Sequence, residues 1–156
     1  MIWHSRTGAA EAMARAAANG AALDCTVRLV AAQDVCADDL LGAGGALFVC
    51  PENLGTMSGM MKDMFDRLYY PLLGLIEGRV YATAIAAGSD GSGAQAQIDR
   101  IVKGWRLRRV ADPLVINLGA QTPAQILGAK TLSDKALNQC HELGQALGAG
   151  LALGIY

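Results

Sequence analysis

The chain of 156 residues contains few aromatic residues and carries almost no net charge. Phe, Trp and Tyr together make up 5% of the sequence, and the formal net charge at pH 7 is −1. Proteins that bind nucleic acid usually present a basic face and aromatic rings on which bases stack, so this function is not expected. A strongly acidic docking face for partner proteins is not expected either.

Patterns for metal binding and for membrane insertion are also scarce. The four cysteines, Cys25, Cys36, Cys50 and Cys140, form no C-x-x-C pair, and only two histidines could complete a zinc site. No signal-peptide pattern is found, and no apolar run reaches the roughly 18 residues that a membrane helix needs. We therefore expect reduced, mostly buried thiols in a cytoplasmic protein that does not enter a membrane.

The sequence does contain enough apolar material for one hydrophobic core. Hydrophobic residues make up 53% of the chain and charged residues 17%. A chain of this length typically forms one domain and buries about two-thirds of the surface that its unfolded form exposes. No repeat, low-complexity run or linker divides the sequence, so we expect residues 1–156 to form a single domain.

Five short apolar segments predict strands, and the segments between them predict helices. The expected strands are 1–4, 25–32, 45–50, 79–88 and 111–119. Helical spacing predicts helices over 9–19, 59–72, 93–103 and 133–149, with Gly20 as the glycine that ends the first. Continuous apolar runs are typical of parallel strands covered on both faces. The alternation predicts an α/β fold: a doubly wound, five-stranded parallel sheet with helices on both faces.

In such sheets ligands bind beyond the carboxyl ends of the strands, where the loops 4–10, 50–58 and 87–93 are expected. The first loop contains Ser5, Thr7 and Gly8 and leads into a helix. Hydroxyl groups and the N–H groups of a helix N-terminus can hold a phosphate. Thr7 as a plain helix cap and Gly8 as a turn residue explain the same residues equally well. The lysine of a P-loop and the glycine spacing of a dinucleotide motif are both missing.

The other two loops combine small residues with hydrogen-bonding residues, which suits the binding of a flat polar ring. For 51–58 alone, a plain strand-to-helix connection with Ser58 as helix cap is the simpler interpretation. An exposed turn explains 87–93 equally well. In a sheet of order 2-1-3-4-5, however, all three loops would converge at the point where the strand order reverses. One loop would then hold a phosphate, and the other two a flat ring.

Three segments resemble motifs of the flavodoxin-like superfamily, and within it of the NAD(P)H-dependent FMN reductase and quinone-reductase-like branch. They are HSRTGAAEAMA, PENLGTMSGMMKDMFDRL and AAGSDGSGA, in the order in which the family has them. The resemblance covers nearly the whole chain and implies FMN as cofactor. It implies that the phosphate is held by Ser5, Arg6, Thr7, Gly8, Ala9 and Ala10. The isoalloxazine ring would be bordered by Pro51, Glu52, Asn53, Leu54, Gly55 and Thr56, and its other edge by Gly88, Ser89 and Asp90.

The resemblance implies an oxidoreductase that takes hydride from NADH or NADPH and passes it on to a quinone, free flavin or another small molecule. The cofactor carries this chemistry, so no catalytic side chain is expected. Neither ring loop contains Trp, Tyr or Phe, whereas flavodoxin-type electron carriers usually clamp the ring between aromatic side chains. An electron carrier without its own substrate, or a binding module that has lost FMN, remains as an alternative.

Two further features bear on the fold. The first expected strand is central in the order 2-1-3-4-5, and a central strand usually has about five residues. Only Met1, Ile2 and Trp3 precede His4, so this strand is expected to be short. The many alanines predict a thin core, which would suit a homo-oligomer.

Overall fold

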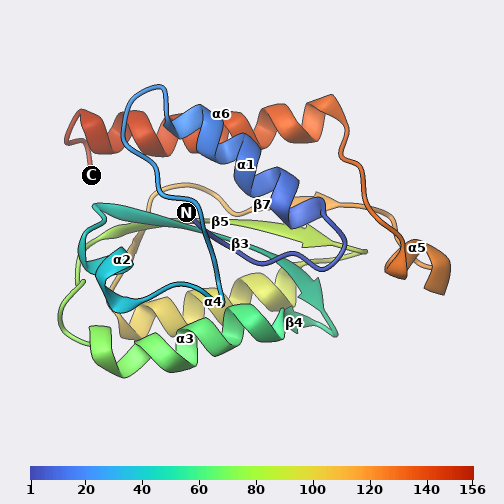
Figure 1. The fold of residues 1–156 in the computed structure, drawn as a ribbon, viewed down its shortest axis with the longest axis horizontal. Helices are drawn as coiled ribbons and strands as arrows, with labels where there is room; N and C mark the ends of the chain where they lie inside the picture. Colours follow the sequence, from blue (N-terminus) through green and yellow to red (C-terminus); the bar gives the residue numbers. More distant parts are fainter.

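The structure is a computed structural model that describes residues 1–156, and its sheet lies between two layers of helices (Figure 1). Five strands match the predicted segments, and two further strands are short. The strands are β1 (Ile2–Trp3), β2 (Val30–Ala31), β3 (Gly45–Asn53), β4 (Thr56–Met57), β5 (Val80–Ala87), β6 (Arg108–Arg109) and β7 (Leu114–Asn117). The helices are α1 (Ala9–Ala21), α2 (Ala37–Leu41), α3 (Gly59–Leu72), α4 (Ser92–Gly104), α5 (Pro123–Leu127) and α6 (Asp134–Ala152).

The topology of the sheet agrees with the predicted fold class. The strand order is β2-β1-β3-β5-β6, and β7 also pairs with β5. Counting only the five predicted strands, this is the order 2-1-3-4-5, and all of their pairings are parallel. β6 and β7 lie along the same edge of β5.

The first two strands are much shorter than β-propensity suggests. The predicted strand 25–32 is reduced to Val30 and Ala31, which pair with Ile2 and Trp3 of β1. Residues 26–29 have strand-like alternation but no partner strand beside them. The length of β2 is therefore set by the length of its neighbour and not by its own sequence.

On one face of the sheet, α1 and α6 pack against each other through backbone contacts. A Cβ atom added at Gly20 would lie 2.0 Å from the His141 carbonyl oxygen, and one added at Gly144 would lie 1.9 Å from that of Ala17. The prediction that Gly20 ends the first helix is wrong, because α1 continues to Ala21. Gly20 is instead required for the close approach of the two helices.

On the other face, α3 and α4 cover a core of larger side chains. The rings of Phe48 and Phe65 have centroids 5.1 Å apart, and those of Phe65 and Trp105 are 5.4 Å apart. The Trp105 indole N–H donates to the Tyr69 carbonyl oxygen at 2.9 Å. Most of the few aromatic residues therefore lie in this core, away from the carboxyl edge of the sheet.

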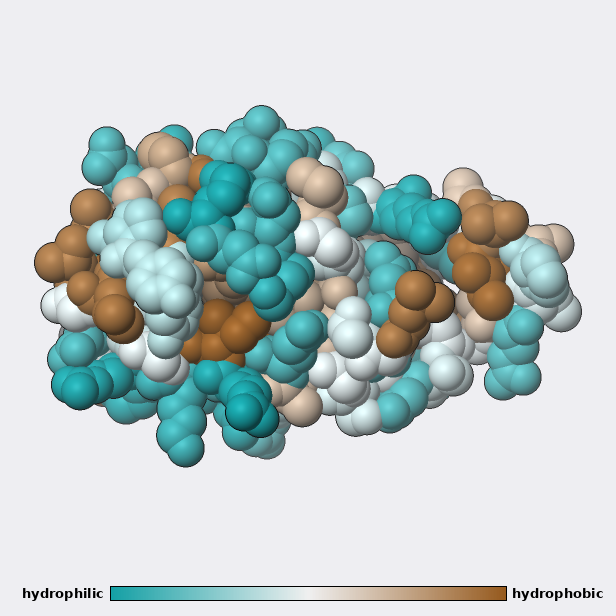
Figure 2. Space-filling model, turned by 90° about the horizontal axis from the view of Figure 1, so that it is seen from below, coloured by the Kyte–Doolittle hydropathy of each residue, from teal (hydrophilic) through white to brown (hydrophobic).

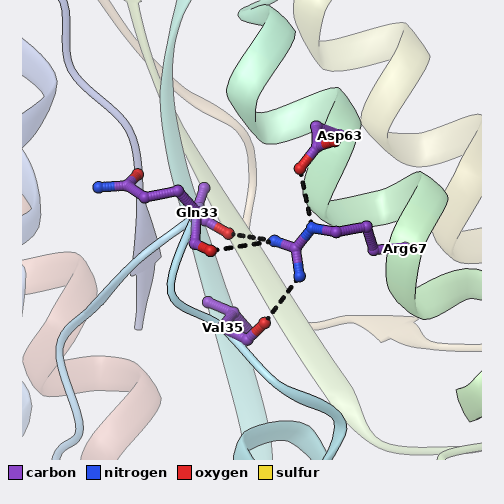
Figure 3. A network of polar contacts seen from close by, with 5 residues as sticks. Gln33, Val35, Asp63 and Arg67 are labelled. Carbon is purple, nitrogen blue, oxygen red and sulfur yellow. Dashed lines mark hydrogen bonds and ion pairs between the residues drawn. The ribbon is translucent and has the colours of Figure 1, made fainter.

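Arg67 of α3 fixes the loop that follows β2 (Figure 3). Its guanidinium group pairs with Asp63 at 2.8 Å, as the i,i+4 spacing suggests. The same group donates to the carbonyl oxygens of Ala32 at 2.8 Å and Val35 at 3.1 Å. One charged side chain thereby ties the loop after β2 to α3.

The four cysteines are free and differ in burial. Cys50 and Cys140 are buried as expected, Cys36 is exposed, and Cys25 is half-buried. Burial raises the pKa of the Cys50 thiol to about 12, so this thiol is neutral and unreactive at neutral pH. No helix is long and apolar enough to cross a membrane.

Candidate functional site

The loops after β1, β3 and β5 meet at the carboxyl edge of the sheet, around a hollow of about 100 Å³. Most of the residues proposed to hold a cofactor lie in its wall. These are Ser5, Arg6, Thr7, Ala9, Ala10, Pro51, Glu52, Asn53 and Gly88. The remaining ones lie in the same three loops but outside the wall of the hollow: Gly8, Leu54, Gly55, Thr56, Ser89 and Asp90.

A fourth segment, residues 118–130 after β7, also lines the hollow through Leu118, Ala120, Ile126 and Lys130. Sequence reasoning missed it, although its place after a predicted strand should have led to it. The Lys130 N–H donates to the Thr7 carbonyl oxygen at 2.8 Å and ties this segment to the first loop.

The short helix α5 of this segment projects from the body of the molecule (Figure 1). None of its residues is buried, and the side chains of Ile126 and Leu127 are 52% and 65% exposed. Figure 2 shows hydrophobic side chains gathered on this projecting end. An apolar surface therefore lies directly beside the hollow.

The first loop ends at a helix N-terminus whose donors are unused. Gly8, with φ of 95°, is the N-cap of α1, and no side chain caps the helix. The interpretation of Thr7 as the helix cap is therefore wrong. The N–H groups of Ala9, Ala10 and Glu11 donate to no group of the protein, although Ala9 and Ala10 are almost fully buried. Such a group of unpaired N–H donors is suited to an anion.

The charges around this loop also favour an anion. Arg6 is exposed and forms no ion pair within the chain, so its guanidinium group is available. Lys130 lines the same hollow, and its ammonium group donates to the carbonyl oxygens of Ile126 at 3.3 Å and Gly128 at 2.6 Å. The Ser5 hydroxyl accepts from the Gly8 N–H at 3.0 Å and so shapes the turn.

His4 links the first loop to the second. Its Nδ1 atom lies 2.9 Å from the hydroxyl oxygen of Ser58, which is completely buried. Ser58 stands at the N-cap position of α3, but its side chain makes no capping bond, contrary to the simpler interpretation above. Burial lowers the pKa of His4, so its ring is neutral at neutral pH.

The second loop is a β-hairpin and not an irregular connection. β4 pairs antiparallel with the end of β3, with Glu52 opposite Met57 and Asn53 opposite Thr56. Leu54 and Gly55 form the two-residue turn, with φ of 53° and 72°. Turns with two positive φ values match the twist of a hairpin. The Leu54 side chain is fully exposed at the tip.

The carboxylate of Glu52 joins the second and third loops. It accepts from the N–H groups of Gly91 at 2.7 Å, Gly93 at 3.0 Å and Ala94 at 3.1 Å, at the start of α4. A Cβ atom on Gly93 would lie 2.0 Å from the Gly55 carbonyl oxygen, so the hairpin rests directly on this helix end. Glu52 lines the hollow, but its carboxylate oxygens already accept hydrogen bonds from N–H groups of the protein.

The order of the strands and the convergence of these loops define a flavodoxin-like α/β fold. The chain is 27% identical to a flavodoxin of Aquifex aeolicus (strain VF5) over 164 positions, which cover 98% of this chain and 86% of that protein. No known protein-family profile matches the chain.

Solved structures agree with this description of the fold. An archaeal flavodoxin superimposes with a TM-score of 0.78 at 21% identity and covers 96% of this chain and 95% of its own. A flavone reductase superimposes with a TM-score of 0.72 at 18% identity, over 96% of this chain and 62% of its own length. Proteins named as a flavodoxin and as a flavone reductase therefore share this fold.

Proposed function

We propose that the chain binds FMN at the carboxyl edge of the sheet, with the phosphate group in the first loop. The observation that carries the proposal is the set of unpaired N–H groups of Ala9, Ala10 and Glu11, two of them on almost fully buried residues. A phosphate dianion would accept from these groups, and the Arg6 guanidinium group would neutralise part of its charge. Thr7 lies in the wall of the same hollow.

The flat ring would lie over Pro51, Glu52 and Asn53 on one side and near Gly88 on the other. The hollow of about 100 Å³ is smaller than the roughly 300 Å³ of an enclosing ligand pocket. The ring would therefore rest in a shallow, open position. The similarity to a flavodoxin over nearly the whole chain supports the same cofactor.

We further propose that the protein is an NAD(P)H-dependent oxidoreductase that reduces a quinone, free flavin or another small acceptor. Bound FMN would supply the redox chemistry, and the chain would hold and orient it. The supporting observation is that no Phe, Trp or Tyr lines the hollow, so one face of the ring stays open to a second small molecule.

A flavodoxin-type electron carrier is the second candidate function. It is favoured by the match to the flavodoxin of Aquifex aeolicus, which covers 98% of this chain. In that role the exposed apolar side chains Leu54, Ile126 and Leu127 would contact a protein partner beside the ring.

The cofactor proposal is tested by an absorbance spectrum of the purified protein after excess FMN has been added and then removed. Riboflavin is the matched control because it has the same ring and no phosphate. We expect retained bands near roughly 370 and 450 nm with FMN, and much weaker retention of riboflavin. A protein that stays colourless with both would contradict FMN binding, and equal retention of both would contradict the phosphate site.

The two activities are then separated by mixing the FMN-loaded protein with NADH or NADPH without oxygen. Bleaching of the 450 nm band within seconds, followed by recovery of the band on addition of a quinone, would support the oxidoreductase. A band that bleaches only with a chemical reductant would favour the carrier.

A further inference from the structure

Lys130 stands where the segment after β7 returns to the first loop. Its N–H donates to the Thr7 carbonyl oxygen at 2.8 Å, and its carbonyl oxygen would lie 3.7 Å from a Cβ atom added at Gly8. Lys130 also lines the hollow of about 100 Å³, together with Ala9 and Ala10. The backbone of Lys130 is therefore fixed directly beside the loop that is proposed to hold the phosphate.

The ammonium group of Lys130 holds the C-terminal end of α5. It donates to the carbonyl oxygens of Gln125, of Gly128 at 2.6 Å and of Ile126 at 3.3 Å. An ammonium group has three N–H donors, so two of them make short bonds and the third makes a long, weak one. Lys130 forms no ion pair within the chain. Its third donor is therefore free to turn to a stronger acceptor.

The helix α5 depends on bonds at its two ends. It has five residues, none of them buried, and a helix of this length is not stable in water by itself. At its start the Thr122 hydroxyl accepts from the Gln125 N–H at 3.3 Å, and the Gln125 side chain accepts from the Thr122 N–H at 3.0 Å. At its end Lys130 is the only side chain that bonds the carbonyl oxygens. A change at the Lys130 ammonium group therefore affects the whole of α5.

We propose that Lys130 is a second cation of the phosphate site and that it links bound phosphate to α5, which rests on the FMN site proposed above. Because the hollow is small, an anion inside it lies within reach of the flexible lysine side chain. A phosphate oxygen would replace the Ile126 carbonyl oxygen, while the two short bonds to Gln125 and Gly128 remain. The exchange replaces a weak bond by a charge-assisted one between opposite charges, which is about twice as strong as a bond between neutral groups.

The charges of the site agree with this role. A phosphate monoester carries about −1.5 to −2 charges at pH 7. Arg6 alone would leave part of that charge unbalanced beside the almost fully buried Ala9 and Ala10. Arg6 and Lys130 line the hollow together and would balance it.

The link makes the position of α5 depend on the phosphate. α5 carries Ile126 and Leu127, whose exposed side chains form the apolar surface beside the hollow. With phosphate bound, the end of α5 is anchored through Lys130 to the first loop. The apolar surface beside the flavin ring is therefore fixed more firmly after the cofactor has bound. Because linkage is reciprocal, bonds that fix α5 also strengthen the binding of phosphate.

Three variants separate this role from a purely structural one. Lys130→Met keeps the long side chain and removes its charge, and Lys130→Arg keeps the charge. Arg6→Met is the matched control, because it removes a cation that lines the same hollow from a different loop. Flavin fluorescence gives the affinities for FMN and riboflavin. In Lys130→Met we expect affinity for FMN to fall about tenfold or more and affinity for riboflavin to stay unchanged, while Lys130→Arg should keep most of the FMN affinity.

Amide hydrogen exchange in α5 gives a readout that needs no flavin. The N–H groups of Ile126 and Gly128 close this helix. In the unchanged chain inorganic phosphate, compared with chloride at the same ionic strength, should slow their exchange at least about threefold. Lys130→Met should show no such slowing at any phosphate concentration. Arg6→Met should show it in full once phosphate saturates the site, because its link to α5 is intact.

Several results would overturn the role of Lys130. In Lys130→Met, FMN and riboflavin would be weakened equally or neither would be weakened, or inorganic phosphate would still slow exchange in α5. A chain that retains FMN while its α5 amides do not respond to phosphate would contradict only the link through Lys130. Slowing by phosphate in a chain that retains no FMN would contradict only the FMN site, and a chain that binds neither would contradict both.

Discussion

The first loop and the two ring loops lie at the same edge of the sheet but use their backbone donors differently. In the first loop the N–H groups at the start of α1 donate to no protein group. At the start of α4 the N–H groups of Gly91, Gly93 and Ala94 are bonded to the Glu52 carboxylate. Two helix N-termini therefore face one region, one with its donors unused and one capped by the protein itself.

The difference indicates which helix end can take an external anion. An anion at α4 would have to displace Glu52, which is negatively charged and makes three hydrogen bonds. An anion at α1 displaces nothing and gains the N–H groups together with Arg6. The composition of the two loops gives no reason for this difference in pairing, since both contain glycine and hydroxyl residues.

The largest effect is expected from giving α1 the kind of cap that α4 already has. In Gly8→Asp the new carboxylate should bond the unused N–H groups, and aspartate tolerates a positive φ better than most residues. We expect FMN affinity to fall about 100-fold or more, while strain at the positive φ of position 8 lowers the unfolding midpoint by a similar amount in Gly8→Asp and in its control Gly8→Asn. Titration of FMN fluorescence and thermal unfolding measure the two changes.

Gly8→Asn is the control for this change, since it offers a neutral cap of the same size. It should weaken FMN binding less than the aspartate does. If Gly8→Asp binds FMN as tightly as the unchanged chain, the phosphate is not held at α1.

The second effect concerns the link between the ring loops. Glu52→Ala removes the acceptor of three backbone N–H groups, and bonds to a charged group contribute about 1.5–3 kcal/mol. We expect the free energy of unfolding to fall by about 2–3 kcal/mol and the amides of Gly93 and Ala94 to exchange faster. Riboflavin and FMN should be weakened by the same factor, because the phosphate loop is untouched. Glu52→Gln keeps one side-chain acceptor, so its free energy of unfolding should lie between those of Glu52→Ala and the unchanged chain. A loss of affinity for FMN alone, with riboflavin binding unchanged, would show that Glu52 acts on the phosphate.

The third effect concerns the hairpin turn beside the ring. We propose that a backbone N–H near Gly55 and Thr56 donates to the N5/O4 edge of the bound ring, as an amide there would tune its potential. Thr56→Pro removes one such N–H and should lower turnover with NAD(P)H about tenfold by altering the flavin potential.

Thr56→Val is the matched control, since it keeps the N–H while losing the side-chain bonds to the Asn53 and Met57 carbonyl oxygens. An unchanged flavin potential and unchanged turnover in Thr56→Pro would show that this amide does not contact the ring.

The smallest effect concerns His4, which connects the first loop to the second through Ser58. Burial lowers the pKa of His4 in the folded chain, so folding favours the neutral ring. The stabilisation is present above the unfolded pKa of about 6.5 and is lost as pH falls through the lower folded value. The unfolding midpoint should fall between pH 7 and pH 5, and it should fall less in His4→Gln. An equal fall in His4→Gln and in the unchanged chain would mean that other groups cause the pH dependence of stability.

Local signals in the sequence predicted most of the secondary structure correctly. The α3 helix has the predicted bounds, the strand order is as expected, and the Ser5–Gly8 motif lies at the end of β1. Such features depend on residues that are close in sequence: helical spacing, i,i+4 charge pairs and apolar runs. A single sequence was therefore enough to infer the fold class and the position of the first loop at the end of β1.

Other features depend on contacts between distant segments, which no local pattern records. The Glu52 carboxylate accepts from N–H groups about forty residues away in the sequence. The Lys130 N–H donates to the Thr7 carbonyl oxygen across most of the chain. Gly20 allows α1 to approach the backbone of α6 closely and does not end a helix. β2 is short because its partner is short, whatever its own propensity. The sequence by itself determined which elements form and in what order. Only the tertiary structure decided which backbone groups are paired and which are left for a ligand, because pairing depends on what packs alongside.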